Sequence, residues 1–302
     1  MIAAQTLNIM KYTSKKLWSQ IVILLLGCIC NAWAAEPTVK DIIIRQSKTQ
    51  DITSEDYYFY RLLELALRKT DADWGKASIK QLSYRAEDKR LHAALIQGKV
   101  DILWAPTSEH LEQKMLPVRI SLLKDLNNYR LLLIRKHDQP RFSAVHNLDD
   151  LRKLTGGMSS QWVDADIMTY NKLPLVQAVG YGKLFKMLAA KRFDYYSRGL
   201  YQIQSEVDFY PELELEIEQD IMLSYPNYVY FFVHKNNNTL AERITQGLKI
   251  AQQDGSFDQL FNSIPRYQWG LNFCNIINVK YLNYSHYHNI QRMIYKINNT
   301  CF

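Results

Sequence analysis

Two stretches of similar pattern decide the fold: LHAALIQGKVD at residues 91–101 and LFKMLAAKRFD at residues 184–194. Leucines align at the first and fifth positions, a large apolar residue aligns at the tenth, and both stretches end in aspartate. Each pattern predicts a helix that breaks at small or basic residues and leads into a short apolar strand. Chance similarity between two helix–strand joins is the alternative. We interpret the repeat as two lobes of similar build, which present their strand ends to a shared cleft.

The segments around this repeat predict an α/β fold. Between residues 35 and 268, apolar runs alternate with helical periodicity. DIII at residues 41–44 predicts a short strand, and apolar spacings of three and four predict a helix from Ser54 to Thr70. Acidic and apolar residues alternate over residues 212–220, which predicts a half-buried strand with its acids in solvent.

Residues 1–34 are typical of an export signal. Lys15 and Lys16 precede a short apolar run, and AWA follows at residues 32–34. This order predicts a Sec-type signal peptide cleaved after Ala34, because the run is shorter than the ~20 residues that span a membrane. LLGC at residues 25–28 also resembles a lipobox, so lipid attachment at Cys28 is the alternative. Either reading predicts a periplasmic protein.

The positive charge of the chain lies at its ends. Of 37 basic residues, three lie in residues 1–34 and four in residues 259–302, and neither segment contains an acid. The body therefore has 30 basic and 30 acidic residues. A nucleic-acid-binding domain carries a basic excess, so nucleic acid is not an expected partner.

The last segment, residues 269–302, differs in composition from the body and is expected to be an atypical C-terminal tail. It contains Cys274 and Cys301, and an oxidising compartment would permit a bridge between them. Its histidines and cysteines lack the short spacing of a zinc site. No metal or cofactor is predicted.

Motifs of common enzymes are absent from the sequence. It contains no G-x-S-x-G elbow, Walker loop, H-E-x-x-H or G-x-G-x-x-G pattern. The body also contains no cysteine nucleophile. We therefore predict a binding protein and not an enzyme, with an enzyme on the same scaffold as an alternative.

Candidate ligand-binding residues follow the repeated stretches, because open α/β sheets bind ligands beyond the carboxyl ends of their strands. Trp104 and Thr107 follow Asp101 and offer an aromatic face and a hydroxyl. Arg198 follows Asp194, and its guanidinium suits a carboxylate or phosphate. A structural ion pair with an acid of the body is the alternative for Arg198.

Five more residues are candidates from their expected positions. Arg130 and Tyr228 lie where the chain is expected to cross between the lobes, and Tyr57 opens the first helix. Trp162 offers a stacking face, and Asp164 could accept hydrogen bonds from a ligand. Core or hinge packing is the alternative for the aromatic residues, and a helix cap is the alternative for Asp164.

Six motifs in order resemble the type II periplasmic solute-binding proteins, in particular the family-3 group with its amino-acid receptors of ABC transporters. The motifs are GKVD at residues 98–101, YRLLLIRK at 129–136, NLDDL at 147–151, KRFD at 191–194, YVYFFV at 228–233 and DGSF at 254–257. The resemblance implies two α/β lobes joined by a two-strand hinge. Lobe 1 would comprise residues 35–127 and 228–268, and lobe 2 residues 128–227.

The resemblance also implies a monomer that captures a small-molecule ligand between its lobes for a membrane permease or receptor. Amino-acid receptors of this group usually carry an arginine soon after the position of Thr107 and an acid after that of Asp194. Here Glu112 and Arg198 occupy those neighbourhoods. We therefore expect a small polar or anionic solute, such as an amino-acid-like compound or an organic acid. A sensory or accessory binding protein without a transporter is the alternative.

Overall fold

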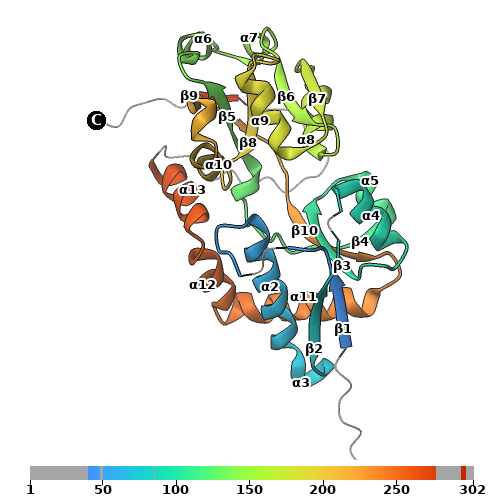
Figure 1. Cartoon of the computed structure of the whole chain (residues 1–302). Helices are drawn as coiled ribbons and strands as arrows, with labels where there is room; N and C mark the ends of the chain where they lie inside the picture. The colour runs from blue at the N-terminus through green and yellow to red at the C-terminus, as the bar shows by residue number, and fades with distance from the viewer. Residues whose placement is uncertain (1–39, 48–49, 85, 277–293, 297–302) are drawn as a thin grey trace, which may run out of the picture. The chain divides into compact units, whose positions relative to one another are not determined.

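The computed structural model describes residues 40–47, 50–84, 86–276 and 294–296 (Figure 1). The expected signal peptide, the lipobox at Cys28 and the second cysteine of the tail, Cys301, lie outside the described residues. None of the helices in the described ranges has the length and apolar character that crossing a membrane requires. The described chain is α/β, as the sequence predicts.

The first set of strands forms two small sheets. β1 (Lys40–Ile44) pairs in parallel with β2 (Ala77–Gln81). β10 (Val229–His234) lies between β3 (Ile102–Pro106) and β4 (Met115–Val118) and is antiparallel to both. The helices that belong to these segments of the chain are α2 (Glu55–Lys69), α3 (Asp71–Trp74), α4 (Asp88–Ile96), α5 (Glu109–Lys114), α11 (Asn238–Gln253), α12 (Ser256–Asn262) and α13 (Pro265–Ile276).

The second set of strands forms one mixed sheet in the order β11-β9-β5-β8-β6-β7. Its strands are β5 (Tyr129–Arg135), β6 (Gly156–Ser159), β7 (Leu175–Ala178), β8 (Tyr195–Gly199), β9 (Leu215–Ser224) and β11 (Ile294–Lys296). The α-helices between these strands are α6 (Gln139–Ser143), α7 (Leu148–Leu151), α8 (Val163–Tyr170), α9 (Tyr181–Ala189) and α10 (Ile203–Phe209). β6 and β8 are parallel neighbours, so their carboxyl ends lie at the same edge of the sheet.

Within the described residues, two continuous segments link the sets of strands. The chain passes from β4 to β5 through residues 119–128, and it returns from β9 to β10 through residues 225–228. Side-chain amides join the two links: Asn127 donates to the carbonyl of Asn227 at 2.6 Å, and the amide of Asn227 donates to Asn128 at 2.8 Å. The links are therefore fixed to each other.

The elements predicted from the repeat are present. α4 leads into β3, and α9 leads into β8. The predicted helix 54–70 is α2, and its apolar side chains, Phe59, Leu62, Leu63 and Ala66 among them, are buried. Gly255 takes a φ of 79° between α11 and α12, as its position in the DGSF motif indicates. α13 runs from Pro265 to Ile276 and so crosses the expected start of the tail at residue 269.

The prediction that every acid of residues 212–220 lies in solvent is wrong for Glu218. Glu218 is fully buried, and its carboxylate accepts hydrogen bonds from the amides of Asp220 and Ile221 and from Gln139. β9 is irregular here, because its pairing with β5 jumps from Ile217 to Met222. This bulge interrupts the alternation of the strand and turns Glu218 inward.

Candidate functional site

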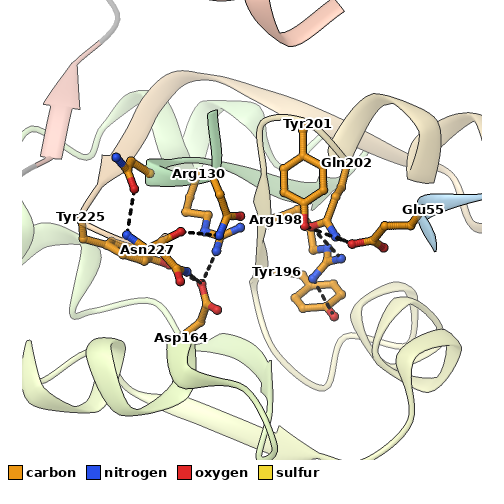
Figure 2. A network of polar contacts seen from close by, with 11 residues as sticks. Glu55, Arg130, Asp164, Tyr196, Arg198, Tyr201, Gln202, Tyr225 and Asn227 are labelled. Carbon is orange, nitrogen blue, oxygen red and sulfur yellow. Dashed lines mark hydrogen bonds and ion pairs between the residues drawn. The ribbon is translucent and has the colours of Figure 1, made fainter. Parts of the chain in front are cut away.

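Arg198, near the end of β8, is the centre of a buried polar group (Figure 2). Its guanidinium carbon lies 4.8 Å from the ring centre of Trp162, 4.7 Å from that of Tyr196 and 5.5 Å from that of Tyr181. These distances are in the range of cation–π interactions. Trp162 directly precedes α8 and follows β6, so the parallel pairing of β6 and β8 brings it to Arg198.

A buried acid neutralises this guanidinium. The Nε and Nη2 atoms of Arg198 donate to the two carboxylate oxygens of Glu206 on α10, with Nε at 2.7 Å. Nη2 also donates to Gln202 at 3.2 Å. Burial by itself would lower the pKa of Arg198, but Glu206 and the neighbouring tyrosines raise this pKa above its ordinary value. The guanidinium therefore stays charged. It forms a buried ion pair, which was the alternative to ligand binding in the sequence analysis of Arg198.

Glu55 of α2 connects this group to the first set of strands. Its Oε1 accepts hydrogen bonds from Gln202 at 2.6 Å and from the hydroxyl of Tyr201 at 3.0 Å. Figure 2 shows Glu55 approaching these residues from the side opposite Arg130. Burial raises the pKa of Glu55, and the charges of Arg266 and Arg198 oppose that rise.

Arg130 and Asp164 form a second buried ion pair beside the first group. Arg130 Nη2 lies 2.8 Å from Asp164 Oδ1, and both side chains are less than a tenth exposed. The same oxygen accepts hydrogen bonds from the Tyr225 hydroxyl at 2.7 Å and from Asn227 at 3.2 Å. Asp164 in the first turn of α8 is thereby tied to β5 and to the return link. The pair Arg130–Asp164 fixes the two links where they meet the six-stranded sheet.

The glycine at the end of β8 separates the two ion pairs. Gly199 is the strand partner of Arg130, and a Cβ at residue 199 would lie 2.7 Å from Arg130 Nη1 and 3.0 Å from Gln202 Oε1. Any side chain here would push one of these groups away. The absence of a side chain at Gly199 thus allows the Arg130 and Arg198 groups to pack next to each other.

The two tryptophans predicted to be ligand-binding faces donate hydrogen bonds to acidic residues on α4 and α2. Trp162 Nε1 donates to Asp88, the first residue of α4, at 3.2 Å. Trp104 Nε1 donates to Asp56 of α2 at 3.2 Å, and its ring stacks on Phe59. Trp104 is buried in the core, whereas Trp162 is half-buried and lies over Arg198.

The other candidates lie outside the Arg198 group. The Thr107 hydroxyl donates to Glu112 at 2.6 Å, and Glu112 in turn pairs with Arg119. Tyr228 stacks on Tyr230, and its carbonyl accepts the Thr107 amide. Tyr57 is half-buried against the main core. The eight predicted residues thus fall into two contacting pairs, Arg198 with Trp162 and Arg130 with Asp164, and four others; their roles stay predictions.

Sequence reasoning missed Glu55, Tyr181, Gln202 and Glu206, which complete the polar group. A helical spacing signals part of it, because Gln202 and Glu206 lie four residues apart, at the start of α10 and one turn into it. Glu55 carries no such signal, since its contacts are with residues almost 150 positions away. The assembled group offers aromatic faces, amide groups and paired charges, which suits recognition of a small polar molecule. Among the described residues, no group of acidic, histidine or cysteine side chains could hold a metal ion.

Solved structures share this fold. An ancestral arginine-binding protein bound to arginine matches with a TM-score of 0.56 and 14% identity, covering 74% of this chain and 98% of that chain. An amino-acid ABC transporter substrate-binding protein from Streptococcus pneumoniae bound to L-arginine matches with a TM-score of 0.56 and 13% identity, covering 76% and 95%. A histidine kinase sensor domain with similarity to periplasmic binding proteins matches with a TM-score of 0.54 and 14% identity, covering 76% and 97%.

No protein-family model matches the chain, and a comparison with curated proteins gives no match. The structural matches establish the fold, which is that of the type II periplasmic binding proteins. The resemblance noted from the six sequence motifs is thereby confirmed at the level of the fold.

Proposed function

We propose that this chain is an exported solute-binding protein, which captures a small polar solute between two lobes and presents it to an ABC-type permease. The observation that carries the proposal is the Arg198 group beyond the end of β8. It draws Glu55 from α2, Trp162 from the start of α8 and Gln202 from the start of α10 to one place. Ligand sites of α/β folds lie at such strand ends.

The charges of the site bear on the class of solute. Both buried arginines already have carboxylate partners, since Arg198 pairs with Glu206 and Arg130 with Asp164. An anionic solute would have to take the place of one of these acids. A polar solute with hydroxyl, amide or amine groups can bind beside them, at the half-buried Glu55 and Trp162. We therefore place polar, amino-acid-like compounds ahead of organic acids.

The proposed capture is a closure of the two lobes. Lobe 1 (residues 35–127 and 228–268) and lobe 2 (residues 128–227) would move about the links that Asn127 and Asn227 join. Binding favours the closed state by the extra contacts that the solute makes there. Arg198 and Trp162 would form the floor of the site, with Tyr57, Trp104, Thr107 and Tyr228 in supporting roles.

The decisive experiment identifies the solute. Compounds released from the purified protein by denaturation are analysed by mass spectrometry, and each is then tested for stabilisation of the protein against heat. A true solute raises the unfolding midpoint in a saturable way and reduces the radius of gyration in solution scattering. Trp162→Ala should weaken this binding at least tenfold, and Trp74→Ala, a change on α3, serves as the control. If the solute bound Trp162→Ala and Trp74→Ala equally well, the Arg198 group would not be part of the binding site.

The similarity to a histidine kinase sensor domain favours a second candidate, a sensory binding protein without a transporter. The two functions differ in the partner that recognises the ligand-bound protein. Reconstituted permease whose ATP hydrolysis rises with the loaded protein would establish transport, whereas activation of a kinase would establish sensing. We propose no catalysis, and recovery of the solute unchanged after incubation tests that point.

A further inference from the structure

The walls of the Arg198 cage are held by contacts that do not involve Arg198. We use the term cage for Trp162, Tyr181, Tyr196, Gln202 and Glu206. The rings of Trp162 and Tyr196 stack at 6.4 Å with an interplanar angle of 11°. The Tyr181 hydroxyl donates to Glu206 at 2.6 Å. Phe185 packs edge-on against both Tyr181, at 5.1 Å, and Tyr196, at 5.2 Å. These contacts support the walls of the cage independently of Arg198.

The cage contacts Arg198 through the guanidinium head of this side chain. Four hydrogen bonds leave its nitrogens, to Glu206, Gln202 and Tyr196. Three aromatic rings lie around its central carbon. A planar cation between aromatic faces, with a carboxylate along one edge, has the contacts by which proteins recognise guanidinium groups. None of these contacts requires the covalent link to residue 198.

We propose that the cage is a guanidinium-binding site, occupied in the native chain by its own Arg198. The tether gives this guanidinium a local concentration in at least the ~mM range, so the native chain excludes free cations from the cage. Arg198 is on this view a specificity-determining residue that denies the cage to basic solutes. This role in specificity rests on the proposed function, whereas guanidinium binding by the cage does not, because all residues of the cage belong to the segments of the six-stranded sheet.

The test removes Arg198 and offers a replacement for it. In Arg198→Ala the carboxylate of Glu206 loses its buried partner, and ethylguanidinium should restore that partner. We expect saturable binding by calorimetry with a Kd of ~1 mM, as for other very small ligands. At ten times the Kd, the unfolding midpoint should rise by about 3–6 °C. Ethylurea, the neutral molecule of the same shape, should give neither effect.

Three further proteins complete the test. The native protein should not bind ethylguanidinium in this way, and neither should the double variant Arg198→Ala/Glu206→Gln, because it has no carboxylate to neutralise. Arg141→Ala removes a half-exposed guanidinium that pairs with Asp194, and it should not gain ethylguanidinium binding. Equal binding by the native protein or by the double variant would overturn the proposal.

A buried carboxylate without its partner is strongly destabilising, so a second measurement covers the case in which Arg198→Ala does not fold alone. Refolding by dilution is then measured in ethylguanidinium and in ethylurea, with circular dichroism as the readout. Recovery of the folded state only in ethylguanidinium supports the proposal. Failure of ethylguanidinium to act better than ethylurea, in binding or in refolding, would show that Arg198–Glu206 is an ordinary structural ion pair.

Discussion

Asp101 and Asp194 hold the same pair of backbone hydrogen bonds at equivalent places in the repeat. The amide of Asp101 donates to the carbonyl of Ile43 at 2.9 Å, and its carboxylate accepts from the amide of Ile43 at 2.7 Å. The amide of Asp194 donates to the carbonyl of Thr155 at 2.7 Å, and its carboxylate accepts from the amide of Thr155 at 2.9 Å. Each aspartate thereby attaches the start of its strand, β3 or β8, to a neighbouring segment.

Removing either carboxylate should destabilise the fold. Asp101→Ala and Asp194→Ala each leave a backbone amide without its charged acceptor, and we expect losses of about 1–3 kcal/mol in the free energy of unfolding. The loss should be larger for Asp194, which also pairs with Arg141 at 3.0 Å. Urea unfolding followed by circular dichroism measures both. Asp149→Ala, at a side chain that is 84% exposed, is the control. A loss equal to that of the control would show that the shared geometry contributes no stability.

This repeat explains why much of the fold could be predicted. A helix, an aspartate and an apolar strand recur with their order intact, and the aspartate makes the same pair of hydrogen bonds in both copies of the repeat. The meeting of Trp162 and Arg198 also follows from a general rule, because parallel neighbouring strands bring their carboxyl ends to one edge. The rule applies because β6 and β8 are parallel neighbours in the sheet.

The rest of the site depends on geometry that local patterns do not encode. The sequence shows that Glu206 lies one helical turn beyond Gln202. Whether Glu206 faces Arg198 depends on the direction of α10 after β8, which the sequence does not show. Glu55 meets Gln202 only through the packing of segments far apart in the chain. Glu218 is buried because β9 bulges, and period-two alternation assumes a strand without a bulge.

The buried pair Arg130–Asp164 should be sensitive to the loss of one partner. Asp164→Ala leaves a buried guanidinium without its acid and removes the acceptor of Tyr225 and Asn227. We expect a loss of about 3–5 kcal/mol in the free energy of unfolding. The double variant Arg130→Met/Asp164→Leu should lose much less, because no charge then stays buried alone. Lys153→Ala, at a side chain that is 75% exposed, breaks the pair with Asp150 and should change stability little. If the double variant were as unstable as Asp164→Ala, the uncompensated charge would not be the cause.

The contact of α11 with α2 should not tolerate a methyl group at Gly247. A Cβ there would lie 2.0 Å from the carbonyl oxygen of Ala66, an atom of the α2 backbone. Alanine favours a helix over glycine by about 1 kcal/mol, but separating the helices should cost more than that gain. We expect Gly247→Ala to lower the free energy of unfolding by at least ~2 kcal/mol in urea titrations. Lys249→Ala, an exposed change on the same helix, is the control; a stabilised Gly247→Ala would mean that the helices separate at little cost.

Glu55 should make stability depend on pH in a direction set by its burial. Burial raises the pKa of Glu55 above its ordinary value of 4.5, so the folded state holds this proton more tightly than the unfolded chain. The resulting stability is fully present below the unfolded pKa and is lost as pH rises through the folded pKa. Glutamine at residue 55 does not titrate. The free energy of unfolding of the native protein minus that of Glu55→Gln should therefore fall with pH above ~4.5, by at most about 1.4 kcal/mol per pH unit.

Burial also raises the pKa of Glu218, but that acid is present in both proteins and cancels in the difference. Urea unfolding between about pH 4 and pH 8 measures the two curves, and a constant difference would show that Glu55 titrates alike in the folded and unfolded chain.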